Sequence, residues 1–111
     1  MEITIKNSEK RIKLPIKMAS GISRYGGLMF KSIDSCNLLF DFKRDVKIAF
    51  HSILVFFPFI LIWLDERNNV LEYRRVEPFT WYIFPRKPFR KVLEIPLNNA
   101  NNKVLSLIFN M

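Results

Sequence analysis

Cysteine, histidine and glycine are scarce in this chain of 111 residues, which has one cysteine, one histidine and three glycines. A single cysteine, Cys36, cannot form an internal disulfide, and one histidine with scattered carboxylates does not provide the clustered ligands of a metal site. The pair Gly26-Gly27 lacks both the spacing and the following Lys-Ser or Lys-Thr of a phosphate-binding loop. We therefore expect no disulfide, no metal and no cofactor.

The chain also lacks a signal-peptide pattern, because residues 1–10 alternate charged residues with isoleucine and contain no apolar stretch. Together with the lone cysteine, this predicts a cytoplasmic protein. One uncharged run, residues 48–64, approaches the length of a membrane-spanning helix. It contains His51 and Pro58 and is rich in Phe, Ile and Val, which favours two buried strands joined at Phe57-Pro58 over a membrane span.

Basic residues exceed acidic residues by eighteen to ten, which gives a net charge of +8 and a pI near 9.9. Such a surface attracts polyanions and anionic lipid headgroups. The basic residues are spread along the whole chain, so a purely solubilising role is the alternative.

Alternation of apolar and polar residues, with short apolar runs, is typical of β-strands over most of the chain. We expect a hairpin over residues 3–18, a turn at 66–69 where asparagine tolerates a left-handed backbone, and an asparagine-rich turn at 98–102. Residues 20–31 break the pattern and suit a loop or, at most, a short helical turn. Further strands are predicted at residues 38–42, 46–57, 59–65, 70–76, 92–97 and 104–109. The fold class expected is all-β, a single domain over residues 1–111 with about eight short strands in a sandwich or barrel.

Residues 73–91 combine the highest local density of aromatic and basic side chains with prolines that interrupt regular structure. Cations can hold phosphates while aromatic rings stack on bases, so this loop is a candidate site for single-stranded nucleic acid. The alternative is that the rings cap the open end of the β-structure while the cations face water. The candidate nucleic-acid-binding residues are Arg74, Arg75, Trp81, Tyr82, Arg86, Lys87, Arg90 and Lys91.

His51 lies in an apolar segment, where a histidine is typically a core residue. Ser52 follows it directly, and neighbouring strand residues point to opposite faces, so a nucleophile and base pair is not expected here. One enzymatic alternative remains, in which Arg24 holds an anionic substrate and His51 acts as the acid or base. It requires His51 to reach solvent.

Several segments together resemble the uncharacterised family catalogued as domain of unknown function 192, in particular its cytoplasmic archaeal members. The resemblance covers residue 12 to the C-terminus, and its most specific part runs from Arg24 to Lys31. It implies a small β-sandwich or barrel of jelly-roll type and no established activity. The matching segments are Arg24, Gly27-Leu28-Met29-Phe30-Lys31, Leu38-Leu39-Phe40-Asp41-Phe42, His51, Phe57-Pro58, Leu64-Asp65, Val76-Glu77-Pro78 and Val92-Leu93-Glu94-Ile95-Pro96.

Two positions depart from the pattern of the family that the chain resembles. Its members carry an acidic residue two places after the proline of the Phe-Pro segment, where this chain has Ile60. They also tend to have glycine after the last Val-Leu-Glu strand, where this chain has Asn98 and Asn99. Asparagine also adopts positive φ, so the turn is expected to persist, whereas any function of the acidic position is lost.

The sequence thus favours a non-catalytic binding or accessory module over an enzyme, with an anionic ligand or nucleic acid as the candidate partner. If the protein has a pocket, we expect the long aromatic loop and the Gly-Leu-Met segment to converge on it. A homodimer formed by pairing of edge strands is an open alternative. The predicted pocket residues are Arg24, Met29, His51, Arg75 and Trp81.

Overall fold

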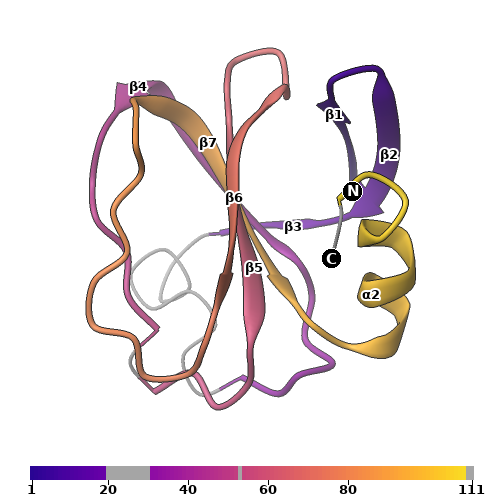
Figure 1. The fold of residues 1–111 in the computed structure, drawn as a ribbon, viewed down its shortest axis with the longest axis vertical. Helices are drawn as coiled ribbons and strands as arrows, with labels where there is room; N and C mark the ends of the chain where they lie inside the picture. Colours follow the sequence, from indigo (N-terminus) through magenta and orange to yellow (C-terminus); the bar gives the residue numbers. More distant parts are fainter. Residues whose placement is uncertain (20–30, 53, 110–111) are drawn as a thin grey trace.

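The computed structural model describes residues 1–19, 31–52 and 54–109 (Figure 1). Five strands form one sheet in the order β3-β4-β7-β5-β6, and two more form a separate hairpin, β1-β2. Neighbouring strands of the large sheet are antiparallel, except that β3 is parallel to β4. The elements are β1 (Glu2–Asn7), β2 (Lys10–Pro15), β3 (Lys17–Met18), β4 (Leu38–Val46), β5 (Phe59–Leu64), β6 (Val70–Val76), β7 (Phe89–Pro96) and α2 (Asn99–Leu105).

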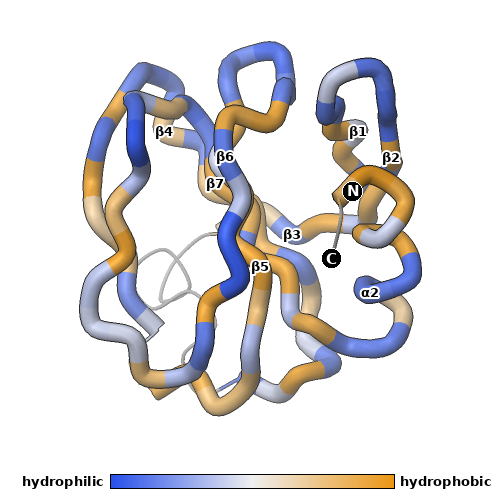
Figure 2. The backbone as a smooth tube through the Cα atoms, viewed as in Figure 1, coloured by the Kyte–Doolittle hydropathy of each residue, from blue (hydrophilic) through white to orange (hydrophobic). Residues whose placement is uncertain are grey.

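The sheet is covered on both faces, which explains why β5 is hydrophobic at every position. Its even-numbered residues from Ile60 to Leu64 pack with the β1-β2 hairpin and α2, and its odd-numbered residues from Phe59 to Trp63 pack with the segments around Val55 and Ile83. A strand buried on both faces reads as a continuous apolar run. Figure 2 shows this hydrophobic stretch along β5 and hydrophilic residues at the turns.

A layer without regular strands covers the second face of the sheet. It consists of the described residues in 47–57 and 77–88, and we call it the outer layer. Figure 1 shows these two segments running side by side, and an isolated antiparallel bridge joins Phe50 to Ile83. The strand predicted over residues 46–57 is therefore wrong, because β4 ends at Val46 and Pro58 joins an irregular segment to β5.

The predicted strand at residues 104–109 and the asparagine-rich turn at 98–102 are also wrong, because α2 occupies Asn99–Leu105. The helix begins where the Asn98 side chain accepts a hydrogen bond from the Asn101 amide at 2.9 Å. Asn101 and Leu105, four residues apart, are buried on the face toward the sheet. The predicted helical turn at 20–31 lies mostly outside the described residues.

The remaining strand and turn predictions agree with the structure. The strands at β4, β5 and β6 and the strand predicted at 92–97 all form, and Asn68 has the expected left-handed φ of 66°. The hairpin also forms, but it ends at Pro15, and Lys17 and Met18 pair with β4 in the large sheet. The protein is a small all-β structure with one described helix. Jelly-roll connectivity stays a prediction. Within the described ranges no helix has the length and hydrophobicity needed to cross a membrane.

Candidate functional site

The structure brings two of the predicted site residues together in the outer layer. The backbones of Phe50 and Ser52, on either side of His51, bond to Ile83 and Thr80. His51 therefore lies across from Trp81 and Tyr82. Arg24 and Met29 lie outside the described residues.

Ser52 is the residue that holds this layer in shape, and it has no exposed surface. Its Oγ donates a hydrogen bond to the Glu77 carbonyl at 2.7 Å and accepts one from the Thr80 amide at 2.6 Å. Its backbone N–H donates to the Thr80 carbonyl, and its carbonyl accepts from the Phe79 amide. One buried serine thus fixes the turn at 77–80. In the sequence, the only sign of this role is a hydroxyl inside an apolar run.

Two residues with a strained backbone lie next to Ser52, Leu54 in the sequence and Phe79 through its hydrogen bond to the Ser52 carbonyl. Leu54 has a φ of 60° and Phe79 a φ of 61°, both in the left-handed region that side chains with a Cβ disfavour. Such conformations persist when surrounding bonds fix them, and they cluster at functional sites. In this protein the two strained residues lie beside two exposed rings, those of Phe56 and Phe79. These rings pack edge to face with their centroids 5.4 Å apart.

The outer layer presents large aromatic rings to solvent. Trp81 is 77% exposed and Tyr82 is 67% exposed. The rings of Tyr82 and Phe84 lie nearly parallel, at 16°, with centroids 5.7 Å apart, and the Lys47 ammonium lies 5.5 Å from the Phe84 ring centroid. We call the exposed rings of this layer the outer aromatic surface, which comprises Phe56, Phe79, Trp81, Tyr82 and Phe84.

His51 itself is exposed, so the expectation that it is a core residue is wrong. The reason is that residues 47–57 are not a buried strand. The condition set for the enzymatic alternative, access of His51 to solvent, is met, while its other residue, Arg24, lies outside the described part of the chain.

Arg74, the first of the candidate nucleic-acid-binding cations, is committed to contacts within the protein. Its guanidinium lies 5.2 Å from the ring centroid of Trp63, pairs with Glu72 and donates to the Phe84 carbonyl at 3.2 Å. Arg74 therefore fastens the outer layer to the sheet.

Arg75 lies on the opposite face of β6 from Arg74. It is the cross-strand neighbour of Ile60, whereas Arg74 neighbours Leu61, and directly opposed residues point to the same face. Its Nε pairs with the Glu77 carboxylate at 2.8 Å. Ile60 is almost fully buried, so a carboxylate at that position, as the family resemblance implies, would lie beside Arg75.

Arg90 and Lys91 lie at the other end of the sheet from the 77–80 turn. Arg90 pairs with Asp45 and Glu66, and the Lys91 ammonium donates to the Asn68 side chain at 2.8 Å. Of the candidate nucleic-acid-binding residues, the structure thus places four exposed side chains in the outer layer: Trp81, Tyr82, Arg86 and Lys87.

Charge in the outer layer is predominantly positive. Lys47, Arg86 and Lys87 are exposed there, and Glu77, the only carboxylate in 47–57 and 77–88, pairs with Arg75. Beneath the layer, partial burial would raise the pKa of Glu72, but hydrogen bonds from the Arg86 amide and the Arg74 guanidinium lower it overall. The ionised Glu72 anchors the backbone of Arg86, so the exposed cations sit on a fixed segment.

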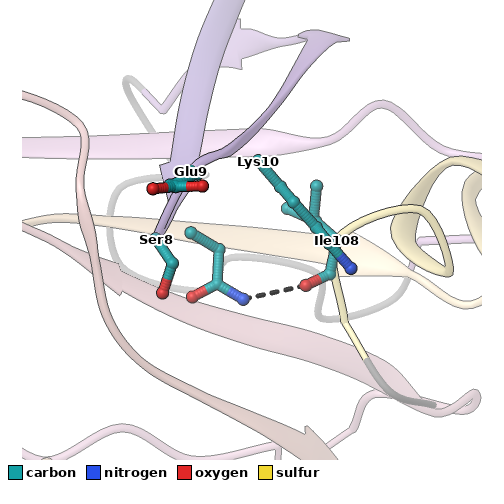
Figure 3. Close-up of a pocket in the computed structure, with 5 residues that line it drawn as sticks. Ser8, Glu9, Lys10 and Ile108 are labelled. Atoms are coloured by element: carbon teal, nitrogen blue, oxygen red, sulfur yellow. Dashed lines mark hydrogen bonds between the residues drawn. The ribbon is translucent and has the colours of Figure 1, made fainter.

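Cavities formed by described residues lie elsewhere. The largest of three has a volume of about 550 Å³ and lies between the β1-β2 turn and the chain after α2 (Figure 3). The Asn7 side chain donates to the Ile108 carbonyl across it at 2.8 Å. Its lining is Asn7, Ser8, Glu9, Lys10 and Ile108, and none of the three cavities is lined by His51, Arg75 or Trp81.

Metal-binding geometry is absent from the described residues, which contain no group of three His, Cys, Asp or Glu side chains able to hold an ion. The single cysteine, Cys36, is exposed and free. What the outer layer offers is a set of exposed rings on a hydrogen-bonded backbone, with cations nearby.

Comparison with solved structures shows the same fold in two bacterial proteins. A candidate transcription regulator from Sinorhizobium meliloti 1021 superposes with a TM-score of 0.72 at 23% identity, over 94% of this chain and 83% of that one. A protein of unknown function from Novosphingobium aromaticivorans DSM 12444 gives a TM-score of 0.71 at 18% identity, over 93% and 76% of the two chains. At these identities the likeness shows the fold alone.

Comparison with curated proteins finds no significant match. A protein family described as "Uncharacterized ACR", DUF192, matches residues 2–106, which is nearly the whole chain. The match includes every strand and all of α2, and it agrees with the segments on which the sequence resemblance rests. The chain belongs to the DUF192 family.

Proposed function

We propose that this protein is a non-catalytic binding module that uses the outer aromatic surface to contact an anionic ligand. The observation that carries the proposal is the exposure of Trp81 and Tyr82 on a backbone held by the buried Ser52. Large rings held open to solvent leave apolar area that a ligand can cover. The cations Lys47, Arg86 and Lys87 beside them favour a negative ligand.

A non-catalytic role is supported by the state of the polar groups around these rings. The Ser52 hydroxyl is buried and occupied by two hydrogen bonds, so it is not poised as a nucleophile. Glu72 and Glu77 are each paired with an arginine. These groups hold the frame of the outer layer.

The two tryptophans of the chain make a direct test convenient. Trp81 is exposed, whereas Trp63 is buried in the core, so acrylamide quenches the fluorescence of Trp81 selectively. Three anionic probes are compared: a single-stranded oligonucleotide, a sulfated oligosaccharide and vesicles of anionic phospholipid. We expect at least one probe to shield Trp81 from acrylamide. A Trp81→Phe variant supplies the Trp63 background, which no probe changes.

Unchanged quenching of Trp81 with all three probes would contradict the proposal. Shielding by one probe that persists when Tyr82, the neighbouring ring, is replaced by Ser and when Lys87 is replaced by Ala would also count against it. In that case the probe contacts Trp81, but the residues around Trp81 do not contribute to binding.

We further propose that the protein acts in the cytoplasm, which the free and exposed Cys36 thiol supports, because exposed thiols persist in reducing compartments. Membership of the archaeal type within the family stays a prediction from the sequence resemblance. Alkylation of Cys36 in intact cells by a membrane-permeant maleimide, but not by an impermeant one, is the expected result.

A further inference from the structure

We infer that the ligand of the outer aromatic surface is single-stranded nucleic acid, an inference that rests on the proposed binding function. Bases stack on exposed rings without regard to sequence, and neighbouring cations hold the phosphates. The outer layer contains both kinds of group on the same face of the sheet.

The rings are arranged as stacking platforms. Tyr82 and Phe84 are offset and nearly parallel, so the pair presents flat faces. Trp81, the most exposed of the described rings, directly precedes Tyr82 in the chain. Flat ring faces close together in the chain suit the faces of unpaired bases, whereas lipid chains have no planar group to stack.

The cations are placed at the border of these rings. Lys47 lies over the Phe84 ring, and Arg86 and Lys87 follow that residue in the chain after Pro85. The Arg86 amide donates to Glu72 at 3.0 Å, which fixes the backbone between the rings and the charges. Arg75 pairs with Glu77, the only carboxylate in 47–57 and 77–88, so no carboxylate of this layer offsets Lys47 and Lys87, whereas Arg86 interacts with Glu72 of β6.

This arrangement also divides the cations of residues 73–91 into two groups with different roles. Arg86 and Lys87 are exposed in the outer layer and can meet phosphates there, although the charge of Arg86 also interacts with Glu72. The other four are held within the protein, namely Arg74 by Glu72, Arg75 by Glu77, Arg90 by Glu66 and Lys91 by Asn68. Net charge alone would not make this distinction.

The experiment measures the anisotropy of a labelled single-stranded oligothymidine of about ten nucleotides, a length within the site size of one small domain. With three cations engaged, we expect the plot of log K against log salt to fall with a slope of about −2. Trp81→Ala is expected to weaken binding roughly 5- to 150-fold. Lys87→Ala is expected to reduce the magnitude of the slope by about 0.7.

Lys13→Ala is the matched control for Lys87→Ala. Lys13 is an exposed lysine on β2, in the hairpin that covers the opposite face of the sheet, so its removal changes the net charge equally. We expect this variant to bind like the wild type. A duplex of the same length is expected to bind more weakly than the single strand, because its bases are already stacked.

Three results would overturn the inference. These are no binding at low salt, equal losses with Lys13→Ala and Lys87→Ala, or a Trp81→Ala variant that binds as well as the wild type. Shielding of Trp81 by anionic vesicles or sulfated oligosaccharide, but not by the oligonucleotide, would refute the nucleic-acid ligand and leave the proposed binding function intact. Failure of every probe would refute both.

Discussion

Ser52 shows how a single polar residue inside an apolar run can determine the shape of a surface. A buried hydroxyl is tolerated when its hydrogen bonds are satisfied, and Ser52 both donates and accepts through its Oγ. These bonds replace the ladder that a regular strand would make. As a result, the chain from 77 to 80 turns sharply and the rings that follow face solvent.

Replacing Ser52 by alanine is expected to destabilise the protein by roughly 1–3 kcal/mol, because the Thr80 amide and the Glu77 carbonyl both lose a partner. Urea unfolding measures the change. Ser106→Ala is the control, since Ser106 is exposed at the end of α2 and its Oγ donates to the Lys103 carbonyl within the same helix. Equal effects of the two variants would show that the Ser52 bonds do not hold the layer.

The left-handed backbone of Phe79 can be tested by two truncations that remove the same ring. Phe79→Gly and Phe79→Ala both lose the contact with Phe56, but alanine keeps a Cβ that disfavours a φ of 61°. We expect the glycine variant to unfold at a higher temperature and to be more stable by about 1 kcal/mol. If the alanine variant is the more stable, Phe79 does not hold a left-handed backbone.

At the scale of secondary structure, the sequence predicted elements well where the periodicity was strong. The hairpin alternates apolar and polar residues, and one of its faces is buried as expected. The C-terminal segment was misread because its apolar residues fit a short strand as well as a short helix. Its asparagines are typical of a turn, but in the structure Asn98 caps α2 and the Asn101 side chain bonds to Asn37 and Pro96.

Asn98→Ala is expected to cost about 1 kcal/mol of stability through loss of the helix cap. Its side chain also donates to the Ile33 carbonyl, so the cost should not fall below this value. Asn99→Ala, at the exposed first position of the helix, should change stability by less than about 0.5 kcal/mol. Thermal unfolding of both variants distinguishes a cap from an ordinary turn asparagine.

Glu72 connects β6 to the outer layer, and its contribution depends on pH. Since the folded protein lowers the pKa of Glu72 below its ordinary value of 4.5, the carboxylate stabilises the fold above pH 4.5. This contribution is lost as the pH falls through the lowered pKa. We expect Glu72→Gln to be less stable than the wild type at neutral pH, and the difference to shrink in acid. A difference in urea midpoint that does not vary with pH would contradict this.

At the scale of the whole molecule, the sequence identified the all-β class and the aromatic loop, but it could not assign the role of each cation. Arg74 and Arg75 are neighbours in sequence, yet the pleat of β6 sends them to opposite faces. Which basic residue pairs with which carboxylate depends on contacts across the sheet. The exposure of His51 could not be predicted for a related reason. Hydropathy shows that a segment is apolar, but it does not show whether the segment pairs with a strand.

The predictions of one domain over residues 1–111 and of edge-strand dimerisation remain to be tested. β6 is an edge of the large sheet, and near its start Lys6 of β1 bonds to Asn68. In a dimer formed through β6, the outer aromatic surface would lie close to the dimer interface. The oligomeric state should therefore be measured together with ligand binding.

The most direct test of the central claim is a map of backbone amide chemical shifts during titration with the single-stranded oligothymidine. The account predicts perturbations concentrated in residues 47–57 and 77–88, with the Trp81 indole N–H among the most affected signals. Perturbations centred instead on the cavity of Asn7–Lys10 and Ile108, or an unchanged spectrum, would contradict it.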